Sequence, residues 1–145
     1  METTKTINLE YSICSDREEV PKVVNEIMAF LQENTPIAGC DCFFDIKVVL
    51  SELISNAVIH GNGCDILKLV DINIIYYNEV LEFIITDRGE EFTPEDKEQE
   101  TLLCESNRGI SICHILCKKL LYKFIEGKGN SARAVFILKE YKGGR

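Results

Sequence analysis

The stretch FFDIKVVLSELISNAVIHGN, residues 43 to 62, places two polar side chains, Glu52 and Asn56, in a run that is mostly apolar. Residues four apart project from the same side of an α-helix, one turn from each other. Apolar residues recur at 46, 49, 50, 53, 54, 57 and 58, the spacing of the buried side of such a helix. A carboxylate and a carboxamide bordering that side are costly to bury unless a metal ion or a polyphosphate binds them. A helix with a solvated polar flank is the alternative that this pair alone leaves open.

Length and composition predict one folded domain over residues 1–145, since 46% of the residues are hydrophobic. No apolar run approaches the roughly 20 residues of a membrane span, and the polar segment 1–11 does not resemble a signal peptide. We therefore expect a cytoplasmic protein. Seven cysteines, an odd number without a secretory signal, are expected to be reduced thiols.

The net charge of −8 argues against a general binder of nucleic acid or membrane surfaces. Residues 90–105 carry seven acidic side chains against Lys97 alone, whereas residues 118–145 carry eight Lys or Arg against two Glu. Two interpretations stay open. The acidic segment covers a nearby anion-binding site, or the two regions are solvated faces of opposite charge.

Hydrophobic periodicity predicts an α+β fold, a two-layer sandwich in which helices cover one face of a mixed, mostly antiparallel sheet. A first helix is expected after the capping residues Ser15 and Asp16, and the helix carrying Glu52 is expected to end near Gly61. A third helix is expected to open at Asn107 and to continue through Leu120. Strands are expected at 5–13, 68–77, 80–86, 121–126 and 132–139, a lid at about 90–107, a turn at 127–130 and a frayed tail at about 140–145.

Three short segments follow one another in a characteristic order. The first is the helix with Glu52 and Asn56, the second is Asp87-Arg88-Gly89 at a strand end, and the third is Asn107-Arg108-Gly109 at a helix start. Together they resemble the Bergerat-type ATP-binding domain of gyrase, heat-shock protein 90, histidine kinases and mismatch-repair MutL proteins. The likeness covers about residues 5 to 140. Within that superfamily the chain looks most like the small bacterial anti-sigma-factor serine/threonine kinases.

The resemblance assigns roles to four of these residues. Asn56 looks like the Mg²⁺ ligand, because this hard cation takes oxygen ligands and keeps several waters. Glu52, one turn earlier, is placed to act as the general base that accepts a proton from an attacking hydroxyl or water. Asp87 matches the residue that accepts a hydrogen bond from the adenine amine. Gly89 is expected to let the base approach the backbone closely.

Further contacts are implied at the phosphate end. The backbone at Arg108 and Gly109 resembles the glycine motif at which N–H groups bind phosphate oxygens, with Arg108 adding a charge-assisted contact. The family often has a second glycine where this chain has Ser111, so fewer phosphate contacts are expected there. Glu91 likewise replaces a glycine that is common in the superfamily.

The segment Gly129-Asn130-Ser131 stands where the family often has Gly-Thr-Thr. Ser131 is expected to donate a hydrogen bond toward the adenine side of the pocket, although an ordinary hairpin turn explains the same residues nearly as well. Cysteine spacing does not favour zinc, because neither Cys40-Asp41-Cys42 nor the pair Cys113 and Cys117 has the usual Cys-x₂-Cys pattern.

The resemblance implies an ATP- and Mg²⁺-dependent serine/threonine protein kinase of the anti-sigma type. Its partners would be a small anti-anti-sigma protein of the STAS type and a sigma factor, and it would form a homodimer. An ATP- or ADP-binding regulatory module without kinase activity is the alternative, because Glu91 and Ser111 replace glycines. Two others are a histidine-kinase catalytic domain, disfavoured because no phosphoacceptor helix precedes Lys5, and a structural domain that binds no nucleotide.

Overall fold

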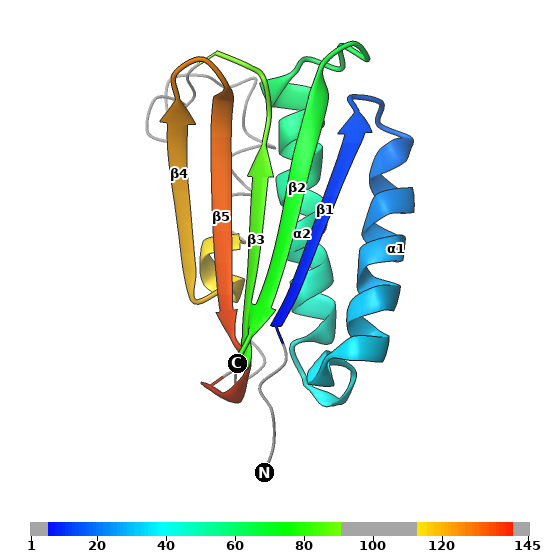
Figure 1. Ribbon diagram of the computed structural model, residues 1–145, viewed down its shortest axis with the longest axis vertical. Helices are drawn as coiled ribbons and strands as arrows, with labels where there is room; N and C mark the ends of the chain where they lie inside the picture. Colours follow the sequence, from blue (N-terminus) through cyan, green and yellow to red (C-terminus); the bar gives the residue numbers. More distant parts are fainter. Residues whose placement is uncertain (1–5, 91–112, 141–145) are drawn as a thin grey trace.

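A computed structural model describes residues 6–90 and 113–140 of the chain. The described residues form a five-stranded sheet with the order β1-β2-β3-β5-β4, and helices lie on one of its faces (Figure 1). The strands are β1 (Thr6–Cys14), β2 (Leu69–Tyr77), β3 (Val80–Thr86), β4 (Lys119–Ile125) and β5 (Gly129–Ile137). The helical elements are α1 (Glu19–Asn34), η1 (Pro36–Gly39), α2 (Phe43–Asn56), η2 (Ala57–Gly61) and η5 (Leu138–Glu140).

The α+β class and the helix-covered sheet are confirmed. All four strand pairings in the described sheet are antiparallel, so this part of the sheet is not mixed as the sequence led us to expect. Each sequential pair, β2–β3 and β4–β5, is joined by a short turn, which by itself makes the pair antiparallel. No helix among the described residues is long and apolar enough to cross a membrane.

The core lies between the sheet and the two long helices. Every second residue of β2 and β3 is buried against α1 and α2, which is the alternation of a sheet with one covered face. The apolar positions that the sequence placed on the inner side of the second helix are all buried: Ile46, Val49, Leu50, Leu53, Ile54, Ala57 and Val58.

Two boundaries differ from the prediction. The described helix after residue 112 covers only 113–116, and β4 begins at Lys119, so Leu120 belongs to a strand. The reason is that Lys118 already donates a 2.8 Å hydrogen bond to the carbonyl of Val135, which commits the chain to pairing with β5. Strand β5 begins at Gly129, so Asn130 lies in a strand and not in a turn.

Ser15 has a different role from the helix cap that its position suggested. Its side chain is fully buried, and its hydroxyl donates a 2.7 Å hydrogen bond to the carbonyl of Lys68. Asp16 is the residue that supports the start of α1, since its Oδ1 accepts a 3.0 Å bond from the backbone N–H of Glu18. Ser15 therefore ties the end of β1 to the start of β2.

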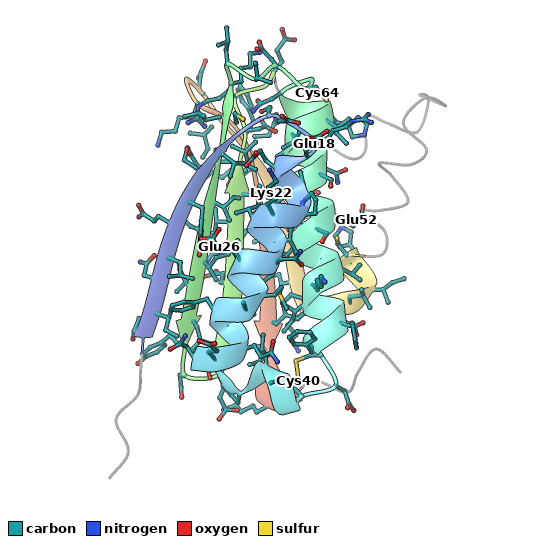
Figure 2. All side chains as sticks on the ribbon, turned by 90° about the vertical axis from the view of Figure 1, so that its right-hand side faces the viewer. Glu18, Lys22, Glu26, Cys40, Glu52 and Cys64 are labelled. Atoms are coloured by element: carbon teal, nitrogen blue, oxygen red, sulfur yellow. A yellow bond between two sulfur atoms is a disulfide. The ribbon has the colours of Figure 1, made fainter. Side chains whose placement is uncertain are left out.

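Not all cysteines are reduced thiols in this structure. Cys40 and Cys42, just before α2, form a disulfide with a Cα–Cα distance of 5.1 Å (Figure 2). The expectation of reduced thiols is wrong at this pair because two residues of separation bring their Cα atoms within bonding range. The free cysteines among the described residues are Cys14, Cys64, Cys113 and Cys117.

Candidate functional site

A pocket opens where α2 and η2 meet the ends of β3, β4 and β5. Its empty space is about 380 Å³, including the part that is open to solvent. Apolar walls with a few polar groups that converge on the interior are typical of small-molecule sites. The lining residues are Leu53, Asn56, Ala57, His60, Gly61, Ile85, Asp87, Tyr122, Asn130 and Ala132.

Asp87 lines this pocket and is held in one orientation. Only 5% of the residue is exposed, although it carries a carboxyl group. Its Oδ1 accepts three hydrogen bonds, from the backbone of Gly89 at 2.8 Å and from the backbone and side chain of Asn130 at 3.0 and 3.2 Å. All three bonds end on Oδ1, while Oδ2 lies against Gly61, which lines the pocket as Asp87 does. The arrangement presents one fixed acceptor to a ligand.

Two glycines allow the close packing around this carboxylate. A Cβ atom on Gly61 would collide with the side chain of Asp87, and one on Gly89 would collide with the carbonyl of Gly61. Gly61 lines the pocket, whereas Gly89 does not. Gly89 thus permits contact between two backbone segments of the protein, and the expected approach of a base to it stays a prediction.

Asn62 connects this end of the pocket to the sheet, and the sequence analysis missed it. Its side chain is buried and donates to the hydroxyl of Ser15 at 2.8 Å and to the carbonyl of Leu69 at 3.1 Å. Its Oδ1 accepts a 2.7 Å bond from the backbone of Arg88, next to Asp87. The Gly-Asn-Gly sequence signalled a helix end, and the buried amide network was not visible from it.

Asn56 lies at the opposite end of the pocket, where Tyr122 is the adjoining polar group. The amide nitrogen of Asn56 is buried and has no hydrogen-bond partner of normal geometry among the described residues. Burial and the nearby Cys113 raise the pKa of Tyr122, and the interaction with Asn56 lowers it. The two side chains are therefore neighbours, and Asn56 lines the pocket, while its role as a Mg²⁺ ligand stays a prediction.

Glu52 is half-buried one turn before Asn56, on the side of α2 that faces away from α1 (Figure 2). It does not line the pocket itself. Its charge acts on two described ionisable groups, Cys113 and Tyr122. Burial, Cys117 and then Glu52 raise the pKa of the Cys113 thiol to about 12. The carboxylate thus adjoins the Asn56 end of the pocket.

Ser131 does not line the pocket. Strand alternation puts Asn130 and Ala132 in the pocket and turns Ser131 to the other face of the sheet, where Thr86 donates to it at 3.4 Å. Asn130 lines the pocket instead, and its side chain donates to Asp87 and, at 2.7 Å, to the carbonyl of Glu90.

Three predicted site residues, Arg108, Gly109 and Ser111, lie outside the described residues, as does nearly all of the expected lid. Within 6–90 and 113–140 there is no group of three or more His, Cys, Asp or Glu side chains that could hold a metal ion.

Comparison with known proteins gives the same assignment over nearly the whole fold. Residues 13–136 match the histidine kinase-like ATPase domain. The chain is 26% identical to the anti-sigma F factor of Geobacillus stearothermophilus over 141 residues, which cover 93% of this chain and 92% of that protein. It is 29% identical to the anti-sigma F factor of Shouchella clausii over 79% of this chain and 80% of that protein.

A shorter match, 40% identity over 57 residues, relates it to the serine-protein kinase RsbW of Oceanobacillus iheyensis, covering 39% of this chain and 36% of that protein. The predicted resemblance to the anti-sigma-factor kinases is confirmed, and the match to the ATPase domain implies ATP binding. The chain belongs to the histidine kinase-like ATPase domain family and is similar to its anti-sigma-factor kinases.

Proposed function

We propose that this protein is an ATP-dependent serine/threonine kinase of the anti-sigma type. The observation that carries the proposal is the fixed carboxylate of Asp87 at one end of a pocket whose other end holds Asn56 and adjoins Glu52. The names of its relatives, anti-sigma F factor and serine-protein kinase, support this class of regulator.

ATP would bind with its adenine at the Asp87 end. The exocyclic amine of adenine donates to Oδ2, and Leu53, Ile85 and Ala132 supply apolar walls for the base. The phosphates then extend toward Asn56. Its carboxamide oxygen fits a single protein ligand for Mg²⁺, because the amide nitrogen is turned to the protein interior. When bound, the ion would neutralise phosphate charge.

Transfer requires a base beside the phosphate end, and Glu52 is the candidate. Its carboxylate accepts the proton of a serine or threonine hydroxyl on the partner. The hydroxyl oxygen forms a bond to the γ-phosphorus, and the bond from that phosphorus to the β–γ bridging oxygen breaks, leaving ADP. Because phosphoryl transfer depends mainly on positioning, few protein side chains are needed.

The phosphate acceptor in this proposal is a small anti-anti-sigma protein of the STAS type, and the unphosphorylated form competes with a sigma factor for the kinase. The kinase itself acts as a homodimer. The long match to two anti-sigma F factors supports these partners. In this proposal ATP binding and phosphoryl transfer take place at one site, and different substitutions can separate them.

The test compares wild type with Glu52→Gln, using γ-³²P-labelled ATP and a panel of STAS-domain proteins with their acceptor serine intact or changed to alanine. We expect Glu52→Gln to lower the transfer rate by about 100-fold or more while the ATP dissociation constant changes less than about threefold. Glu33→Gln, an exposed position near the end of α1, is the matched control and should behave as wild type. Unchanged transfer in Glu52→Gln would remove Glu52 from the mechanism.

The second candidate is a nucleotide-binding regulator without kinase activity, favoured by Glu91 and Ser111 in place of two glycines. The same experiment separates the two. Wild-type protein that binds ATP but labels no acceptor in the panel supports the regulator and contradicts the kinase.

A further inference from the structure

Cys40 and Cys42 form a disulfide in the short connection between η1 and α2 (Figure 2). The pocket lies at the other end of α2, where Asn56 is the last helical residue. At 1.5 Å per residue, the 14 residues of α2 separate the disulfide from that end by about 20 Å. Neither cysteine lines the pocket, so the proposed function leaves the disulfide without a role.

A structural cross-link explains this bond poorly. The two cysteines are only two residues apart, and in the chain-entropy model a disulfide stabilises a fold more when it closes a longer loop. The backbone here is also held without the sulfur atoms. The N–H of Cys40 donates to the carbonyl of Ile37 at 3.0 Å, and the carbonyl of Cys42 accepts a 2.8 Å bond from Ile46. We therefore expect the fold to survive reduction of the disulfide.

The two bonded cysteines differ in their access to solvent. Cys42 is fully buried in the hydrophobic core, whereas Cys40 is only partly buried at the edge of that core. A disulfide is opened by a thiolate that attacks one of its two sulfur atoms, so access decides which sulfur is attacked. A small thiol from solvent can reach Cys40, and Cys42 is then the sulfur that leaves.

The other described cysteines do not share these features. Cys14 and Cys64 have no disulfide partner in the part of the chain that the structure describes. Cys113 and Cys117 are close to each other but buried, and the thiol of Cys117 donates to the carbonyl of Cys113 at 2.9 Å. Burial raises the pKa of both thiols, which disfavours the reactive thiolate. Thiol chemistry among the described residues therefore points to the pair before α2.

We propose that Cys40 and Cys42 form a reversible thiol–disulfide exchange site for low-molecular-weight thiols of the glutathione type. The inference goes beyond the proposed kinase and does not depend on it. In the reducing direction, a thiolate forms a bond to Sγ of Cys40 and the bond between the two protein sulfurs breaks. Sγ of Cys42 leaves with the electron pair and takes a proton from water.

The mixed disulfide at Cys40 is resolved by a second thiolate. It bonds to the sulfur of the first thiol and releases Cys40, which also takes a proton from water. Two low-molecular-weight thiols are thus oxidised to their disulfide, and the protein disulfide is reduced to two thiols. Oxidation of the protein is the reverse reaction, with the low-molecular-weight disulfide as the oxidant.

The backbone keeps the reduced pair ready to close again. The Cα atoms of Cys40 and Cys42 are 5.1 Å apart, within the range that a disulfide spans. Sγ of Cys40 also accepts a 3.2 Å hydrogen bond from the backbone N–H of Cys42. Because the hydrogen bonds that hold this segment do not need the disulfide, the two thiols stay near each other after reduction.

The first experiment is a redox titration of the folded protein with mixtures of reduced and oxidised glutathione. Acid quenching, alkylation and mass spectrometry give the state of the peptide that carries Cys40 and Cys42. Cys14, Cys64 and Cys104 are changed to serine in the protein used, and Cys104 lies outside the described residues. We expect at least half of the pair to be reduced at about 10 mM reduced glutathione, with unchanged far-UV circular dichroism, and to close again when oxidised glutathione is added.

Either failure of this titration overturns the proposal. A pair that stays oxidised at about 10 mM reduced glutathione until urea unfolds the protein is a structural cross-link. A pair that stays reduced at every glutathione ratio is no disulfide site. The titration keeps both cysteines, so its result does not depend on whether a variant of either one folds. It also needs neither ATP nor an acceptor protein, so failure of the kinase proposal leaves it unaffected.

The second experiment tests which sulfur is attacked. Cys42→Ala leaves the partly exposed Cys40, whereas Cys40→Ala leaves the buried Cys42. With oxidised glutathione, the mixed disulfide should form at least about 10-fold faster in Cys42→Ala than in Cys40→Ala, because the thiol has to meet the reagent from solvent. Circular dichroism checks that each variant is folded. Equal rates in two folded variants would contradict the assignment of Cys40 as the attacked residue.

Discussion

The two ends of the pocket are built differently. At the Asp87 end, a buried carboxylate receives three N–H donors, two glycines pack without room for a methyl group, and Asn62 ties the segment to β1 and β2. At the Asn56 end, the amide nitrogen of Asn56 lacks a normal hydrogen-bond partner among the described residues, and Glu52 is half-buried.

The difference follows from what each end has to do under the proposed function. Selective binding of adenine is favoured by a hydrogen-bond acceptor in a fixed position, and the protein fixes the Asp87 carboxylate before any ligand binds. Phosphoryl transfer requires groups that are completed by the nucleotide, an ion and the acceptor hydroxyl. The pocket is thus rigid at the end that would bind adenine and incomplete at the end where phosphoryl transfer would occur.

Gly61→Ala should have the largest effect, because it disrupts the packing at the Asp87 end of the pocket. The new Cβ has to displace either the Asp87 side chain or the η2 turn, because no space exists between them. We expect ATP affinity to fall by more than about 100-fold in calorimetric titration. Gly39→Ala, where a Cβ meets nothing within 4 Å, is the matched control and should bind as wild type. Full ATP binding by Gly61→Ala would show that the packing against Asp87 is unimportant.

Asn62→Ala should destabilise the Asp87 end of the pocket by removing the hydrogen bonds that hold it to the sheet. The change removes three hydrogen bonds and leaves the Ser15 hydroxyl, a buried carbonyl and the Arg88 N–H short of partners. We expect the free energy of unfolding in urea to fall by about 2 to 3 kcal/mol. Asn25→Ala, at an exposed position of α1, should change it by less than about 0.5 kcal/mol. Equal stability of the two variants would contradict the role given to Asn62.

At the Asn56 end, the buried thiol of Cys113 should make the stability of the protein depend on pH. Its pKa is raised from 9.0 to about 12, first by burial and then by Cys117 and Glu52. A raised folded pKa gives stability that is complete below the unfolded value and is lost as pH rises from about 9 toward 12. Between pH 7 and pH 10 the free energy of unfolding of wild type should fall by about 1 kcal/mol more than that of Cys113→Ala, as measured by urea unfolding at each pH. An identical pH dependence in wild type and Cys113→Ala would show that the thiol is not buried beside Glu52.

Most of the fold was predictable because its signals are local. Alternating residues marked β1, β2 and β3, and the apolar positions of α2 were all buried as expected. The errors came from tertiary competition. Leu120 continued a helical pattern but pairs in β4, since Lys118 already bonds to Val135 and the pairing with β5 continues from Lys119 to Ile125.

Less of the candidate site could be predicted, for a related reason. Glu52, Asn56 and Asp87 follow a spacing that sequence shows directly, whereas Asn62 and Asn130 act through partners far along the chain. Ser131 was assigned from the likeness of residues 129–131 to the family's Gly-Thr-Thr, whereas the alternation of side chains along β5 puts Asn130 in the pocket and Ser131 on the other face.

Calorimetric titration of Mg·ATP and Mg·GTP into wild type and Asp87→Asn tests the central claim most directly. The asparagine can keep the three bonds to Oδ1 and exchanges the pocket-facing oxygen for an NH₂ donor, which suits the guanine carbonyl and not the adenine amine. The account predicts that wild type prefers ATP and that Asp87→Asn loses about 10- to 100-fold in ATP affinity while its discrimination against GTP shrinks. Unchanged ATP affinity in Asp87→Asn, or no ATP binding by folded wild type, would contradict it.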